Sequence, residues 1–199
     1  MTRLFPALLV LPFLLIFPQA LRAESEVYGG FGIGYSTYSI DSIDFEDVSF
    51  GNPDFEASSF ATRLFLGLRY GDYVGLEAGY IDFGTVKDRI GFLQGQASIN
   101  YEVESSGYNV SLVGRYPLNE ELAAFGKLGM IRWDSEATLE SFPLSINEEG
   151  TDLIWGLGLD FRGSGRFHVR IEAEFVDIAF ADSWWVLTTS LVYGVPFAR

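Results

Sequence analysis

The sequence has no cysteine among its 199 residues. This absence excludes a disulfide framework, a thiolate metal site and a lipid-modified N-terminal cysteine. Basic residues are also scarce, because 13 Lys and Arg stand against 27 Asp and Glu, for a net charge of −14. Nucleic-acid binding depends on basic patches that contact phosphates, so this balance argues against a DNA or RNA partner.

Long apolar runs are absent after residue 26, and the one near the start covers residues 4–17. It follows Arg3 and is followed by the small residue Ala23, an arrangement typical of a secretory signal peptide. A membrane-spanning helix needs about 20 apolar residues, and this run is shorter and contains prolines. We therefore expect a signal peptide at 1–23, cleaved after Ala23, and an exported β-barrel domain at 24–199.

Aromatic residues and glycine are abundant, with 18 Phe, 10 Tyr, 4 Trp and 22 Gly. A membrane barrel places aromatic residues in belts at its two interfaces. Beyond the signal peptide the apolar residues recur with a period of two, which is typical of strands, and not with the 3.6-residue period of helices. Eight segments show this alternation: residues 27–35, 59–70, 74–80, 108–116, 127–130, 153–161, 167–175 and 187–197.

In each segment one face is large and apolar, and the other is glycine, small polar or charged. A soluble β-protein shows the same alternation with its polar face in water. Such a face would normally be crowded with Lys and Glu and poor in glycine, whereas here it is rich in glycine with few charges of mixed sign. The pattern favours a membrane barrel, apolar outside and polar inside. A soluble periplasmic ligand carrier, which would need no detergent, stays as an alternative.

The predicted connections alternate in length. An even number of strands, with tight turns in the periplasm and longer loops outside the cell, is typical of outer-membrane barrels. We therefore predict an all-β fold, an eight-stranded antiparallel up-and-down transmembrane β-barrel. The tight links are 71–73, 117–121 and 162–166, and the mostly longer ones are roughly 39–58, 85–106, 135–151 and 179–184.

Two features depart from this simple scheme. Arg132 falls on the lipid-facing phase of its strand, which a place at the outer rim would explain, since a long side chain can reach water from there. Residues 97–103 alternate out of phase with the segment that follows them. We interpret them as a strand extension above the membrane, and a ten-stranded barrel stays open because an added pair keeps the count even.

Charged residues on the inward faces predict a network inside the barrel. An eight-stranded barrel is filled by its own side chains, and an unpaired buried ion costs several kcal/mol. The centre would pair Glu77 and Glu172 with Arg170 and Lys127, helped by Arg63 or Arg69. The network would gate a narrow, low-conductance pore or only hold the barrel closed; buried ion pairs are weak evidence for activity, which favours the second role. Its expected members are Arg63, Arg69, Glu77, Lys127, Asp160, Arg170, Glu172 and Glu174.

An enzyme of this membrane would use a histidine with a nucleophile and an acid. His168 is the single histidine. It follows the turn at 162–166, which places it inward at the periplasmic end, and no nucleophile motif surrounds it. We predict no catalytic residues, no cofactor and no metal site; a lipid-modifying activity lost in His168→Ala would contradict this.

Two predicted external loops, 41–56 and 134–152, are acidic and contain no Lys or Arg. Clustered carboxylates suit hard cations such as Ca²⁺ or Mg²⁺, which could bridge to lipopolysaccharide. Their spacing matches no ordered calcium loop. A solvated acidic surface is the favoured interpretation, and calorimetry that shows no heat of calcium binding would end the cation hypothesis.

Three segments together resemble the OmpA-like transmembrane domain: residues 68–80 (LRYGDYVGLEAGY), 107–118 (GYNVSLVGRYPL) and 125–133 (FGKLGMIRW). The likeness covers about 27–197. The final strand, with Leu191, Tyr193, Val195 and Phe197, is similar to the signal read by the outer-membrane assembly machinery, although two residues follow its last aromatic residue. No peptidoglycan-binding domain follows the barrel, so the resemblance implies a small stand-alone barrel without that anchoring role.

The sequence therefore predicts a structural protein of the Gram-negative cell outer membrane. Expected partners are outer-membrane lipids, lipopolysaccharide and the barrel assembly machinery, and a monomer is expected. The alternative from another class is an adhesion or ligand-binding barrel that acts through its acidic extracellular loops. Loss of partner binding on trimming residues 39–58 would favour that alternative.

Overall fold

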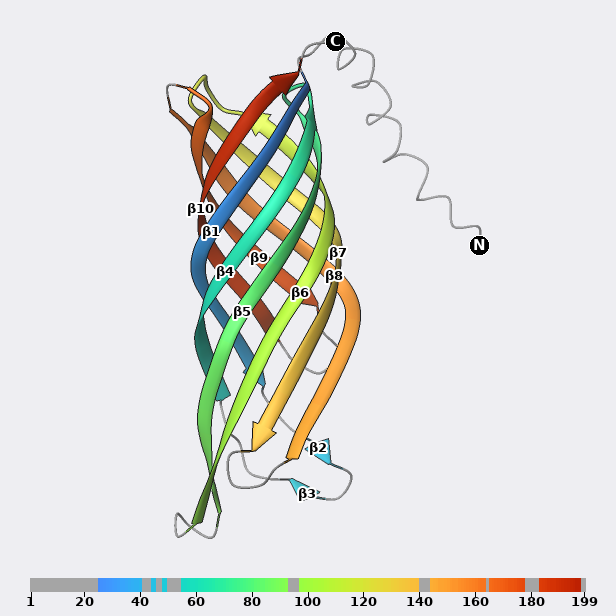
Figure 1. Cartoon of the computed structure of the whole chain (residues 1–199), viewed down its shortest axis with the longest axis vertical. Helices are drawn as coiled ribbons and strands as arrows, with labels where there is room; N and C mark the ends of the chain where they lie inside the picture. Colours follow the sequence, from blue (N-terminus) through green and yellow to red (C-terminus); the bar gives the residue numbers. More distant parts are fainter. Residues whose placement is uncertain are drawn as a thin grey trace, which may run out of the picture.

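The computed structural model describes residues 25–40, 44–45, 48–49, 55–92, 97–139, 144–163, 165–177 and 183–197. Eight long strands form a closed barrel in which each strand pairs with the next along the chain, and β1 closes on β10 (Figure 1). All pairings are antiparallel, so the predicted eight-stranded up-and-down barrel is confirmed. The strands are β1 Ser25–Ile40, β4 Phe55–Tyr70, β5 Val74–Phe92, β6 Ala97–Pro117, β7 Leu122–Leu139, β8 Leu144–Arg162, β9 Phe167–Asp177 and β10 Ser183–Phe197.

The two ends of the barrel differ. We call one end the turn end, because it carries the tight turns that follow β4, β6 and β8 (Figure 1). The start of β1 and the end of β10 also lie there. At the other, the hairpin end, two long hairpins project and a separate two-stranded sheet of β2 (Asp44–Phe45) and β3 (Val48–Ser49) lies nearby (Figure 1). Among the described residues, no helix has the length and apolar character that crossing a membrane would require.

The prediction of long connections at 85–106 and 135–151 is wrong. Backbone pairing continues to Phe92 and Ala97 in the first hairpin and to Leu139 and Leu144 in the second. Apolar alternation does not predict these extensions, because a strand outside the bilayer needs no apolar outer face. Their backbone hydrogen bonds form whatever the polarity of the side chains. Residues 97–103 belong to β6, so the strand extension is confirmed and the ten-stranded alternative is not.

The side chains point as an inside-out barrel requires. Leu64 is 59% exposed and Ile171 is 41% exposed on the outer wall, whereas Glu77 is 1% exposed. Successive strand residues alternate between faces, and every long strand presents a run of large apolar residues on its outer face. An outer wall of leucine and aromatic side chains around buried charges suits lipid and not water.

Aromatic pairs border this apolar wall at both ends. Toward the hairpin end, Tyr80 on β5 and Tyr108 on β6 are cross-strand partners with ring centroids 4.9 Å apart. At the turn end, Phe167 and Tyr193 form a similar pair, with centroids 4.8 Å apart. On β6 the outward apolar side chains run from Tyr108 to Tyr116, close to the 9–11 residues that a tilted strand needs to cross a bilayer.

Closer to the hairpin end than the Tyr80–Tyr108 pair, the two faces of the wall exchange their polarity, so that apolar side chains point inward and polar ones point outward. On β7, Met130 faces outward, but Ile131 and Trp133 are buried inside and Asp134 is exposed. The β7 register with its neighbours runs without a shift through this region, so the strand has not turned over; its surroundings change from lipid to water. Arg132 lies at this boundary and its Nη2 is 2.9 Å from Glu149 Oε2, both side chains being mostly exposed. The boundary explains its place on the lipid-facing phase.

Candidate functional site: the charge-paired lumen

The strands bring charged side chains from four parts of the barrel into one layer. Because strand residues two apart share a face, Arg170, Glu172 and Glu174 line up along the inner side of β9. Arg63 on β4, Glu77 on β5 and Lys127 on β7 meet them from across the lumen. We call these six residues the charge layer, and each is 5% exposed or less.

Arg63 stands at the centre of the charge layer. Its Nη2 is 2.5 Å from Glu77 Oε1 and its Nη1 is 2.5 Å from Glu172 Oε2. It also pairs with Glu174, and Lys127 pairs with the same three carboxylates, its Nζ being 2.7 Å from Glu172 Oε1. Two cations shared among three acids leave no isolated charge, which is what burial demands.

Arg170 connects the charge layer to the turn end. Its Nη1 donates to Glu77 Oε2 over 2.6 Å, and its Nε donates to Asp160 Oδ1 over 2.9 Å. Asp160 is also 3.4 Å from Arg115 Nε and 3.9 Å from His168 Nε2. Asp160 therefore joins the charge layer from its turn side and is shared between Arg170 and Arg115.

The structure does not place Arg69 with the others. The sequence offered Arg63 or Arg69 as helper; Arg63 takes that place, while Arg69 forms an ion pair with Glu26 at the turn end. Arg69 is the penultimate residue of β4, three inward positions closer to the turn end than Arg63, so its side chain lies at the mouth of the barrel. Sequence reasoning missed Glu26 because this residue, the second of β1, precedes the alternating segment at 27–35.

Aromatic rings inside the lumen were also missed. The Arg170 guanidinium lies 4.5 Å from the centre of the Phe125 ring and 5.0 Å from that of Phe65, distances typical of cation–π contacts. Tyr28 lies 5.5 Å from the same guanidinium, and its hydroxyl donates to Glu77 Oε2 over 3.1 Å. The signal was present in the sequence, since all three residues fall on the inward phase of their strands.

Inner-wall glycines make room for these rings. A Cβ at Gly158 would lie 2.4 Å from Phe125 Cζ, and one at Gly30 would lie 2.4 Å from Phe65 Cζ. Both rings are held between arginines and neighbouring strands, so they could not move aside cheaply. The glycine content of the polar faces therefore reflects close packing within a filled lumen.

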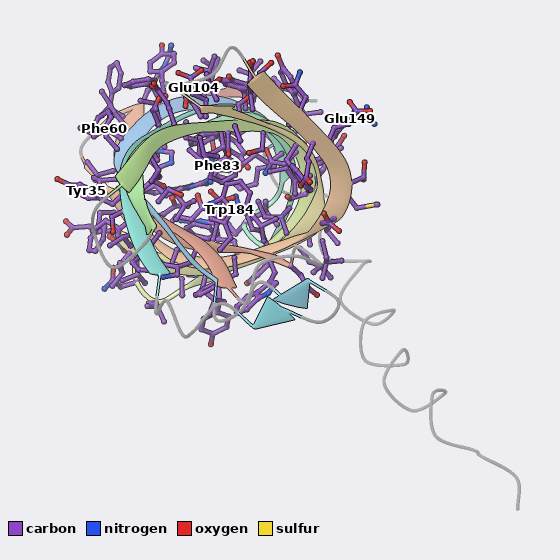
Figure 2. All side chains as sticks on the ribbon, turned by 90° about the horizontal axis from the view of Figure 1, so that it is seen from below. Tyr35, Phe60, Phe83, Glu104, Glu149 and Trp184 are labelled. Carbon is purple, nitrogen blue, oxygen red and sulfur yellow. The ribbon has the colours of Figure 1, made fainter. Side chains whose placement is uncertain are left out.

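Toward the hairpin end, apolar side chains replace the charges. Phe83 and Trp184 pack against each other with ring centroids 4.1 Å apart, and Figure 2 shows both inside the ring of strands, with Tyr35 and Phe60 outside. Phe83 sits at a β-bulge, next to Gly84, whose φ is 82°. We call this group the apolar layer: Ala61, Ile81, Phe83, Ile131, Trp133, Ile154, Val176, Trp184 and Val186.

The acidic hairpin end offers no metal site in the part of the chain that the structure describes, where no three His, Asp or Glu side chains converge suitably. Most of the predicted acidic loop 41–56 lies outside the described residues. In the second acidic stretch, Glu149 is paired with Arg132 and Asp152 accepts a hydrogen bond from Trp133 Nε1 over 2.6 Å. Each of these two carboxylates therefore has its own partner on β7, and they do not share a common site.

Comparison with known proteins identifies the fold family. The family model described as the OmpA-like transmembrane domain matches residues 22–182. The chain is similar to the solved outer membrane protein OprG from Pseudomonas aeruginosa, with a TM-score of 0.61 and 14% identity over 87% of this chain and 97% of that one. It is also similar to Neisserial surface protein A, with a TM-score of 0.57 and 10% identity over 84% and 96% of the two chains.

A third similar structure is Ail of Yersinia pestis in complex with the heparin analogue sucrose octasulfate, with a TM-score of 0.53 and 14% identity over 85% of this chain and 99% of that one. These identities support the fold alone. Comparison with curated protein sequences found no match. Because the family model covers most of the residues, the chain is an outer-membrane β-barrel that belongs to the OmpA-like transmembrane domain family.

Proposed function

We propose that this protein is a structural outer-membrane barrel with a closed, non-conducting lumen. The observation that carries the proposal is the stacking of two filled layers. An apolar layer of side chains that are at most 6% exposed lies on the hairpin side of a charge layer whose members are at most 5% exposed. An ion would have to leave water, pass a dry constriction and then displace paired charges, and each step is unfavourable.

Planar-bilayer recording tests this proposal. We expect the folded wild type to show no conductance steps. The double variant Phe83→Ala/Trp184→Ala, which removes the rings of the apolar layer, should also stay silent because the charge layer remains. Tyr35→Ala/Phe60→Ala, which removes two rings from the outer wall, is the matched control. Regular conductance steps from the wild type would contradict a closed lumen.

The lumen also supports a role without catalysis. His168 lies where the sequence placed it, inward near the turn end, but its nearest acid, Asp160, is already shared with Arg170 and Arg115. An acid engaged by two arginines is poorly placed to orient a general base. We propose that His168 has a structural or binding role and that the protein uses no cofactor.

Export and assembly are part of the same proposal. We propose that cleavage after Ala23 leaves Glu24 as the first mature residue, which the intact mass of protein from outer-membrane fractions checks. The turn end would then face the periplasm, and the monomeric barrel would contact outer-membrane lipid and lipopolysaccharide. Leu191, Tyr193 and Phe197 face outward along β10, in keeping with recognition of this strand by the assembly machinery.

Surface binding through the hairpin end is the second candidate, favoured by the length of the projecting hairpins. Exposed Glu104, Glu136 and Glu149 make this end acidic, and Figure 2 shows Glu104 and Glu149 at the rim. A sulfated ligand such as the one bound to Ail would be repelled here, so any partner should be basic.

We therefore expect the wild type to pass through a heparin column without retention at low salt. Reversing three of these charges, in Glu104→Lys/Glu136→Lys/Glu149→Lys, should produce retention that salt abolishes, because exposed charges are strongly screened. Retention of the wild type would contradict the acidic-surface interpretation. Binding of a basic partner that is lost in the triple variant would establish the adhesion alternative.

A further inference from the structure

A recess of about 260 Å³ opens at the turn end of the barrel. Its wall comes from β1, β4, β8, β9 and β10 and includes Arg69, Arg162, Arg166 and His168. A water molecule takes about 30 Å³ of liquid volume, so the recess can hold a polyatomic ion with several waters. It lies on the turn side of the charge layer, whereas the apolar layer lies on the hairpin side.

Positive charge predominates in this recess. Three arginines line it against two carboxylates, Glu26 and Asp72, with His168 counted as neutral. This excess of one positive charge is a local exception in a chain with a net charge of −14. Basic side chains gathered in one concave site raise the local concentration of anions.

The arginines are incompletely neutralised. Arg69 pairs with Glu26, and Arg162 shares that carboxylate only at 4.0 Å. Arg166 donates through Nη1 to the neutral Tyr193 hydroxyl over 3.3 Å, and no ion pair of Arg166 is found among the described residues. At the inner wall, His168 is 6% exposed and its Nε2 has no hydrogen-bond partner there.

The backbone holds two of these arginines in place. The Arg162 N–H donates to Glu121 O over 2.6 Å, and Arg166 O accepts from the Gly194 N–H over 2.9 Å. Both residues flank the β8–β9 turn, and these bonds connect them to the β6–β7 turn and to β10. Because the backbone is already fixed at both positions, a ligand has to order only the two side chains, which lowers the entropy cost of binding.

We propose that this recess is a binding site for a phosphate group at the turn end of the barrel. Arg162 and Arg166 would supply forked, charge-assisted hydrogen bonds to phosphate oxygens, Arg69 would add positive charge, and His168 would donate from the inner wall. The group could belong to a free phosphate or to a lipid headgroup, since both present the same oxygens. The site does not depend on whether the lumen conducts.

The single histidine makes the test direct, because its imidazole signals need no assignment in tag-free protein. Inorganic phosphate is titrated into folded, detergent-solubilised protein while the His168 resonances are followed by NMR. We expect saturable shifts in the wild type. In Arg162→Ala/Arg166→Ala the apparent affinity should fall at least tenfold. In Arg132→Ala, which removes an arginine at the opposite end, it should be unchanged.

Two further titrations identify the source and the chemistry. Dihexanoyl phosphatidylglycerol that saturates the same shifts at lower concentration than phosphate indicates a lipid headgroup, and the reverse order indicates a free phosphate. Acetate that binds as tightly as phosphate overturns the assignment to phosphate. The proposal also fails if phosphate produces no saturable shift, or if the double variant, shown by its heat-modifiable gel mobility to be folded, binds as the wild type does.

Discussion

Replacing Arg63 by methionine is expected to lower the free energy of unfolding by about 3–5 kcal/mol, the cost of breaking a buried ion pair by removing one partner. Arg63 contacts three carboxylates of the charge layer, Glu77, Glu172 and Glu174. Without it, these acids keep only Lys127 and Arg170 as cations. Urea unfolding of the protein in lipid vesicles, followed by tryptophan fluorescence, measures the change.

Two further variants separate charge balance from side-chain size. Adding Glu174→Gln to Arg63→Met removes one of the uncompensated acids and should recover at least half of the lost stability, a coupling that a double-mutant cycle quantifies. Arg132→Met removes an arginine whose partner is in water, so its effect should stay within about 1 kcal/mol. If Arg63→Met is no more destabilising than Arg132→Met, the charge layer does not hold the barrel together.

Replacing Leu157 by arginine is expected to cost about 2–4 kcal/mol in a bilayer, the range for a cation placed at the midplane of a membrane barrel. Leu157 is 60% exposed on β8, midway along its outward apolar side chains. The same substitution on a water-soluble strand would change little, because surface substitutions usually stay within about 0.5 kcal/mol. The unfolding free energy in vesicles is again the measurement.

Asn147→Arg is the matched control. Asn147 lies on the same outer face of β8 and is exposed, but it belongs to the hairpin extension, where the wall is polar. We expect a change within about 0.5 kcal/mol. Equal costs at the two positions would mean that the wall around Leu157 does not face lipid.

The sequence was sufficient to predict the barrel because one physical rule decides it. A strand between lipid and a filled lumen must alternate strictly, and Leu157, Leu159 and Phe161 do so without interruption. Buried charges must be paired, and this requirement predicted Glu77 and Arg170 as members of one network. The period of the apolar residues predicts the barrel, and the balance of inward charges predicts their pairing.

The sequence was insufficient where the outcome depends on the register between paired strands. The pairing of Arg69 with Glu26 follows from the heights at which β1 and β4 meet, which alternation within one strand cannot give. The apolar layer was missed for a related reason. Trp133 and Trp184 lie inward on their strands, but the rule that the inner face is polar holds only within the bilayer, and the sequence does not mark where the bilayer ends.

Spin labelling tests most directly whether the leucine-rich outer wall contacts lipid, and the cysteine-free sequence allows one label per variant. With the protein in vesicles, a label on Leu157→Cys should relax mainly through oxygen dissolved in the lipid. A label on Asn147→Cys should relax mainly through a water-soluble nickel complex. If the nickel complex reached both labels equally, the wall around Leu157 would face water and the membrane assignment would be wrong.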